Sequence, residues 1–425
     1  MFTFNGWRGA GFLCALGGLA SAGACSSAPD PTTVSAAAGS SAAGSGIVMM
    51  SGASGVSAAG TSGAGTSGAG TSGAGAGGGA GTGGMTATAK CNIFADYTLP
   101  TEKLTETGCV DAKDPTKPSV YLIPYQVNSP LWSDASEKQR YMRIPDGAKI
   151  HVIDCVKEKS TTCAADPFPG VDGHWDYPVG TVMVKTFGFE GTLVETRLLM
   201  KFDASTWTGY SYQWNQAQTE AIVQPNARRS ATFKVGPSQR SQDWNYPSQA
   251  DCTTCHTPYS GTTLGTETRQ FNLMEGAQNQ LERLEQLGML DAPLSRPFLA
   301  PLLPPTGSAG SVQDRARSYL HSNCSYCHRP DGDQVLPDLR YTEPFDFKKM
   351  GICDAKPGRG PVGAAGGEAA ARYFAPGHPE NSVISLRMKS LETNVRMPQI
   401  ATVVADANGQ AVVDAWIKSV STCPK

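Results

Sequence analysis

The stretch that decides how this chain folds reads NCSYCHRPDG, at residues 323–332, and a matching stretch reads DCTTCHTPYSG, at residues 251–261. Each contains two cysteines three positions apart, and a histidine directly follows the second. Closely spaced cysteines serve three chemistries, namely zinc binding, dithiol redox exchange and covalent attachment of haem. The spacing and the surrounding sequence decide among these three.

The distance between the two motifs argues against zinc. A zinc ribbon places its cysteine pairs about 15 to 20 residues apart, whereas 68 residues separate Cys255 from Cys324. A thioredoxin-like dithiol uses one Cys-x-x-Cys pair at the start of a helix that follows a strand. Because Cys-x-x-Cys-His is the attachment signature of c-type haem, the sequence predicts two covalently attached haem groups.

Each residue of such a motif has its own task. Two thiols one helical turn apart can form thioether bonds to the haem vinyl groups, and the next imidazole can bind the iron. The predicted haem-binding residues are Cys252, Cys255 and His256 in the first motif and Cys324, Cys327 and His328 in the second.

Methionines are the candidate second iron ligands. Met397, in NVRMPQI, precedes a proline, which keeps it out of helical conformation and on an extended loop. A methionine–histidine pair raises the reduction potential and suits electron transfer. Met397 is therefore predicted to bind the second iron, and Met274, in FNLMEG, is the nearest candidate for the first. Without a ligand there, the first iron would have an open position at which a small molecule could react.

Helices are predicted around both motifs. Ser311 and Asp314 form a capping-box pattern before a helix that leads into Cys324, and Ser248 and Asp251 repeat that pattern before Cys252. Near the end of the chain, GQAVVDAWIKSV (409–420) places its apolar residues on one helical face. A leading helix, a haem and a closing helix make a small cytochrome c domain, predicted over 306–425, with a first haem-binding helical region over 246–305.

Residues 91–245 have the pattern of β-strands. Apolar and charged residues alternate from Val194 to Phe202, FEG at 189–191 is a turn, and Tyr210, Tyr212 and Trp214 share one side of the next strand. We interpret these aromatic residues as core packing rather than a binding platform. The predicted fold is multidomain α+β, with an antiparallel sandwich or jelly-roll-like domain followed by the mainly α haem region.

The N-terminus has the pattern of an export signal over residues 1–25, with one positive charge, a short apolar stretch and small residues before Cys25. Two processing sites compete, because Ala22-Gly23-Ala24 fits ordinary signal cleavage, whereas Cys25 fits a lipobox. We favour lipidation of Cys25, and Ser26 after it resembles the sorting signal for the outer membrane. Residues 26–90 are rich in Ser, Gly and Ala and contain TSGAG three times in tandem, which predicts a disordered tether.

Twelve cysteines leave six outside the signal region and the two motifs. In an exported protein an even remainder indicates disulfides. Short loops cost the least entropy to close. This favours Cys91–Cys109 and Cys155–Cys163, which leaves Cys353–Cys423.

Longer motifs resemble a known family. YLHSNCSYCHRPDGD, APGHPENSVISLRM and RMPQIATVVADANGQAVVDAWI resemble a bacterial cytochrome c domain, and SPLWSDASEKQRYMRIPDG, WDYPVGTVMVKTFGF and YPSQADCTTCHT extend the likeness upstream. Together, over roughly residues 118–420, they resemble exported dihaem c-type cytochromes. The resemblance implies haem at both motifs and Met397 as a distal ligand, and it supplies no substrate.

The favoured function is electron transfer outside the cytoplasm, with redox proteins or a small-molecule donor or acceptor as partners. The alternatives are a peroxidase-like oxidoreductase that reacts at the first haem, and a β module that binds a partner or ligand. A net charge of −2 gives no indication of nucleic-acid binding.

Overall fold

The computed structural model describes residues 90–424 except 159–162, 164–171, 331, 333, 335, 359–361 and 401. The predicted signal, the predicted lipidation site at Cys25 and the predicted tether up to residue 89 lie outside these residues. Residues 81–425 form one compact unit.

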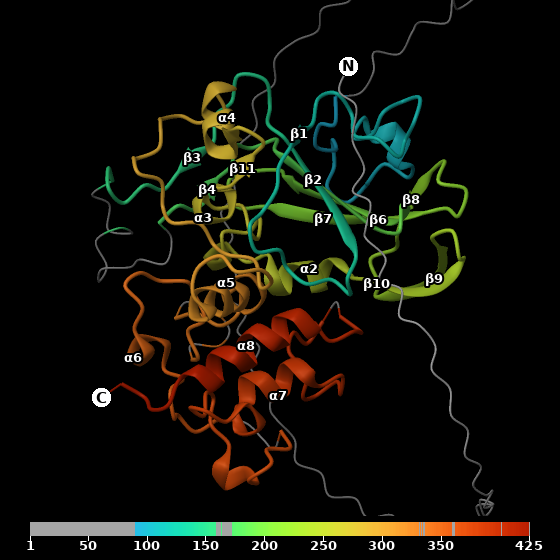
Figure 1. The fold of residues 1–425 in the computed structure, drawn as a ribbon. Helices are drawn as coiled ribbons and strands as arrows, with labels where there is room; N and C mark the ends of the chain where they lie inside the picture. Colours follow the sequence, from blue (N-terminus) through green and yellow to red (C-terminus); the bar gives the residue numbers. More distant parts are fainter. Residues whose placement is uncertain are drawn as a thin grey trace, which may run out of the picture. The chain divides into compact units, whose positions relative to one another are not determined.

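An antiparallel sheet of six strands, in the order β1-β2-β5-β6-β7-β8, dominates the first half of this unit (Figure 1). Its strands are β1 (Ile123–Pro124), β2 (Glu137–Arg143), β5 (Val182–Phe189), β6 (Thr192–Lys201), β7 (Trp207–Trp214) and β8 (Ala221–Val223). The predicted strand from Val194 and the turn at 189–191 are confirmed, with Glu190 and Gly191 both at positive φ. The sheet and the helices after it confirm the α+β class.

Three two-stranded sheets and a set of short helices complete the described fold. The paired strands are β3 (His151–Val152) with β4 (Trp175–Asp176), β9 (Arg229–Val235) with β10 (Arg240–Tyr246), and β11 (Met274–Glu275) with β12 (Gln278–Asn279). The α-helices are α2 (Gln249–Cys255), α3 (Thr268–Phe271), α4 (Gln280–Gln286), α5 (Val312–Cys324), α6 (Phe347–Met350), α7 (Val383–Lys389) and α8 (Ala407–Ser419). The 3₁₀ helices are η1 (Leu104–Thr107), η2 (Pro258–Ser260), η3 (Glu368–Ala370) and η4 (Pro379–Asn381).

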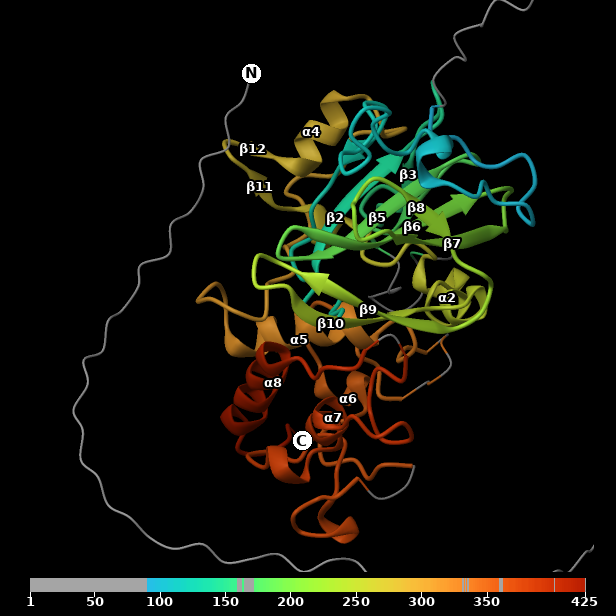
Figure 2. The same ribbon diagram turned by 90° about the vertical axis from the view of Figure 1, so that its right-hand side faces the viewer.

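The two faces of the six-stranded sheet have different surroundings. On one face Tyr210, Tyr212 and Trp214 are buried against the segment that contains Cys91 and Leu104, which confirms that these aromatic residues are core. That irregular segment takes the place of the second large sheet that a sandwich would need, so the expected sandwich or jelly roll is not what the described residues form. The other face is turned towards α2 and the helices that follow (Figures 1 and 2).

The helices after the sheet pack around α5 and α8, which contact each other. Both predicted helices are confirmed, and the predicted capping boxes are present at Ser248 and Ser311. Trp416 of α8 is fully buried, stacks on Phe347 with ring centroids 5.6 Å apart and meets Phe374 edge-on. Among the described residues, no helix combines the length and the apolar character needed to cross a membrane.

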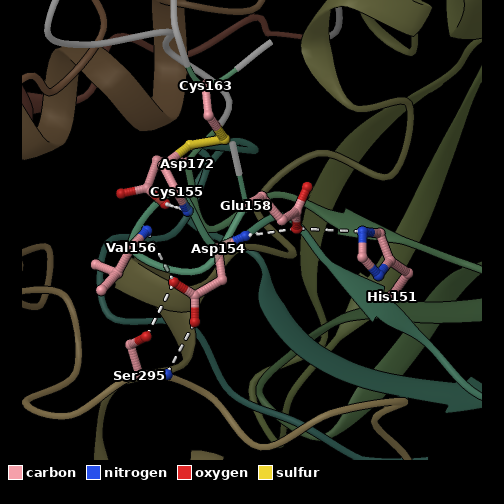
Figure 3. Close-up of a disulfide and its surroundings, with 8 residues drawn as sticks. All are labelled: His151, Asp154, Cys155, Val156, Glu158, Cys163, Asp172 and Ser295. Carbon is pink, nitrogen blue, oxygen red and sulfur yellow. Dashed lines mark hydrogen bonds and ion pairs between the residues drawn. A yellow bond between two sulfur atoms is a disulfide. The ribbon is translucent and has the colours of Figure 1, made fainter. Parts of the chain in front are cut away.

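All three predicted disulfide pairings are confirmed, namely Cys91–Cys109, Cys155–Cys163 and Cys353–Cys423. Figure 3 shows the second of these, where the backbone N–H of Cys155 donates to Asp172 at 3.0 Å. The neighbouring Asp154 accepts from the backbone N–H of Ser295 at 2.9 Å. The bond between Ser295 and Asp154 ties the disulfide loop to a segment that is distant in sequence.

Candidate functional site

A cavity of about 1300 Å³ lies between the six-stranded sheet, on the face turned towards α2, and the helices around α5 and α8. Both Cys-x-x-Cys-His motifs line this cavity. Sites for single small ligands measure about 300–1,000 Å³. The cavity is therefore larger than one such ligand needs.

The first motif is positioned by α2. Ser248 and Asp251 cap this helix reciprocally, and its last turn carries Cys252 and Cys255. The helix contacts β7, where a Cβ atom on Gly209 would lie only 3.1 Å from Cys252 Sγ. Glycine in β7 therefore allows the thiol to approach the strand closely.

His256 ends α2 with its ring in a defined state. Its Nδ1 lies 2.5 Å from the carbonyl oxygen of Thr262. Because a carbonyl only accepts, Nδ1 must donate, which leaves the Nε2 lone pair available. Burial lowers the pKa of His256 to about 4, so the ring is neutral at physiological pH. An imidazole held in this way by a backbone carbonyl is the usual arrangement of a metal-ligating histidine.

The second motif follows α5. Cys324 is the last residue of that helix, and the backbone N–H groups of Cys327 and His328 both donate to its carbonyl. Nδ1 of His328 is buried without a hydrogen-bond partner among the described residues, and burial, followed by the nearby Arg387, lowers the pKa of this histidine. A buried polar atom without a partner is uncommon.

The two motifs lie against each other. Cys327 Sγ is 3.8 Å from the carbonyl oxygen of Thr254, a residue inside the first motif. Cys252, Cys255, Cys324 and Cys327 lie outside these three disulfides, and all four line the cavity.

The two predicted methionine ligands have different positions. Met397 lines the cavity, and its backbone N–H donates to the carbonyl of Arg387 at 3.0 Å. Met274 lies in the β11–β12 hairpin, where 60% of its surface is exposed, and it is not among the described residues that line the cavity. The structure thus brings together the two motifs and Met397 but not Met274.

Sequence reasoning missed three cationic residues of the site. Arg140, Lys185 and Arg197 line the cavity from strands β2, β5 and β6. The alternation of Arg197 with apolar neighbours was visible, but a charged residue on a half-buried strand normally indicates a face in contact with solvent.

Comparison of the chain with protein-family models, curated proteins and solved structures gave no match.

Proposed function

We propose that this protein is a dihaem c-type cytochrome that transfers electrons outside the cytoplasm. The observation that carries the proposal is the convergence of both Cys-x-x-Cys-His motifs on one cavity of about 1300 Å³. The resemblance of residues 118–420 to exported dihaem cytochromes supports the same function.

The residues present fit the proposed group. Haem iron, when bound, supplies a one-electron couple whose potential depends on its ligands and surroundings. Cys252 and Cys255 would hold one haem and Cys324 and Cys327 the other. The hydrogen bond from His256 to Thr262 leaves Nε2 free to bind iron. His328 lines the same cavity, and its Nδ1 has no hydrogen-bond partner among the described residues.

Electron transfer is favoured because the two proposed sites adjoin. The contact of Cys327 with Thr254 supports two redox groups close enough to exchange electrons, and Met397 supports a second haem with two protein ligands. Partners would be redox proteins or a small-molecule donor or acceptor. The lipidated Cys25 would hold the protein at the outer membrane.

One observation favours a second candidate, a haem-dependent oxidoreductase. Met274 lies on an exposed hairpin, so the ligand predicted for the first iron is not at the cavity. An iron with an open position could react with a small molecule. Spin-state spectroscopy separates the candidates, because a high-spin first haem favours the oxidoreductase and two low-spin haems favour the electron carrier.

Mass spectrometry of protein matured in a periplasm tests the proposal. We expect two haem additions in the wild type and one in each of the double variants Cys252→Ser/Cys255→Ser and Cys324→Ser/Cys327→Ser. As a control, Cys91→Ser/Cys109→Ser removes a disulfide pair and should keep both haems. A wild-type protein with one haem or none would show the proposal to be wrong.

A further inference from the structure

Three cations face the cavity in one row across the sheet. Arg140 of β2 is the direct partner of Lys185 of β5, and Lys185 is the direct partner of Arg197 of β6. All three line the cavity. Like charges directly opposite each other destabilise a sheet, so this arrangement is unfavourable unless an anion offsets it.

One of the three charges has an acidic partner. Arg197 donates to both carboxylate oxygens of Glu195 at 2.8 Å. Glu195 is fully buried, and it also accepts from Ser211 at 2.5 Å and from Trp244 at 2.8 Å. These hydrogen bonds occupy most of the acceptor positions of the Glu195 carboxylate.

The other two basic side chains, Arg140 and Lys185, have no acidic partner among the described residues. Lys185 Nζ lies 5.3 Å from the ring centroid of Phe187, which also has the guanidinium of Arg197 at 4.6 Å. Burial, together with the neighbouring Arg140, Lys138 and Arg197, holds the pKa of Lys185 well below its usual range, and burial also lowers that of Arg140. Lys185 is therefore favoured as the neutral amine while no anion is bound, and Arg197 is paired with Glu195, so Arg140 is the cation beside the cavity without an acidic partner among the described residues.

We propose that Arg140, Lys185 and Arg197 form a binding site for carboxylate groups in this cavity. Arginine presents paired N–H donors that match a carboxylate, and buried charges persist only where they are paired. Two sources share this chemistry, namely the propionate groups of the first haem and a free organic acid. Only the first source rests on the proposed function.

The test compares wild-type holoprotein with Arg140→Gln and Lys185→Gln. Lys234→Gln is the matched control, because Lys234 lies on β9 away from the cavity and its Nζ donates to Ser241 at 2.7 Å. Each protein is analysed by mass for its haem content, by calorimetric titration with succinate and by a redox titration. The haem content tests the proposed function, and the succinate titration tests the carboxylate site. Because succinate binding needs no haem, the two proposals can fail independently.

Either of two results supports the site. If the source is a free acid, succinate binds the wild type and the control, and both cavity variants lose affinity at least tenfold. If the source is propionate, succinate does not bind, and both cavity variants lower the potential of the first haem, because a nearby cation favours the reduced iron. The control leaves that potential unchanged.

Other results overturn the site. One is the absence of succinate binding together with unchanged potentials. Another is conversion of the first haem from low to high spin in Lys185→Gln alone, which would make Lys185 an iron ligand instead. Lys185→Arg keeps the charge, so it should behave as wild type even if the glutamine variants fold poorly. A Lys185→Arg protein that loses succinate affinity, or in which the potential of the first haem falls as in Lys185→Gln, would also contradict the proposal.

Discussion

At the scale of single residues, the two motif histidines have different hydrogen bonds. His256 donates to a backbone carbonyl, whereas Nδ1 of His328 is buried and has no hydrogen-bond partner in the part of the chain that the structure describes. A donated hydrogen bond makes the imidazole a stronger ligand. If both bind iron, the two irons therefore have different surroundings even before their second ligands are considered.

Replacing Met397 with Ala should lower the reduction potential of the second haem and leave that haem attached. The thioether would bind iron, but it takes no part in the bonds at Cys324 and Cys327. Redox titration and mass spectrometry measure the two effects. Met388→Ala is the control, because Met388 also lines the cavity. Equal potentials in wild type and Met397→Ala would remove Met397 from the site.

Asp251→Asn should destabilise α2 and with it the first motif. The Asp251 carboxylate caps the helix by accepting from the backbone N–H and hydroxyl of Ser248, both at 2.9 Å, and it pairs with Arg228. Losing such a cap costs about 1 kcal/mol. Thermal unfolding measures the loss, and exposed Asp243→Asn on β10 serves as the control.

The destabilisation should depend on pH in a defined direction. The hydrogen bond from Arg228, with the bonds from Ser248, lowers the pKa of Asp251 from 3.8 to about 2. A lowered carboxyl pKa contributes stability above the unfolded value, and this stability is lost as pH falls through the folded value. The difference between wild type and Asp251→Asn should therefore shrink as pH falls from 3.8 to about 2 and disappear only below about pH 2. A difference that is constant over this range would contradict the assignment.

At the scale of elements, α5 and α8 pack closely because one position of α8 has no side chain. Gly409 is buried in the first turn of α8, and a Cβ atom there would overlap the ring of the buried Tyr319 of α5. This close contact holds the helix that carries Cys324 against the closing helix.

Gly409→Ala should therefore lower stability although alanine favours helices. The gain in helix propensity is about 1 kcal/mol, whereas overpacking a core costs about 1–3 kcal/mol. Denaturant unfolding monitored by tryptophan fluorescence measures the net change. Asn408→Ala at the exposed neighbouring position tests helix propensity alone and should leave stability unchanged or raise it by less than about 0.7 kcal/mol. A stabilised Gly409→Ala protein would show that the helices do not pack as described.

At the scale of the whole molecule, the cavity is walled by segments that are far apart in sequence. The backbone N–H of Trp132 donates to Asn323 at 2.7 Å, and its ring N–H donates to the carbonyl of Val404 at 2.8 Å. Asp134 accepts from the backbone N–H groups of Val403 and Val404, both at 2.9 Å. The segment before β2 thus binds both the end of α5 and the loop before α8.

Cys25→Ser should move the protein from the membrane fraction to the soluble fraction. We expect Cys25 to carry a lipid and the Ser-, Gly- and Ala-rich residues after it to serve as a tether. Fractionation followed by immunoblotting measures the distribution. Cys14→Ser, inside the predicted signal, should leave the distribution unchanged. If the Cys25→Ser protein remained with the membrane to the same extent as wild type, Cys25 would not be the membrane anchor.

Local features of this protein were determined by sequence alone. The capping boxes at Ser248 and Ser311, the closing helix, the strand from Val194 and the three disulfide pairs all follow from short spacings or from loop-closure entropy. The signals for the caps, the helix and the strand lie within a few residues of those features. The disulfide pairs follow because closing the two shortest loops leaves only Cys353 and Cys423 to pair.

Only the tertiary structure decided how the site is assembled. The alternation in β6 shows which residues share a face, but not that β2 and β5 lie beside it with Arg140, Lys185 and Arg197 in register. Nor does local sequence distinguish Met397 at the cavity from Met274 on an exposed hairpin. Strand pairing and burial depend on contacts between residues far apart in the chain, which only the folded protein brings together.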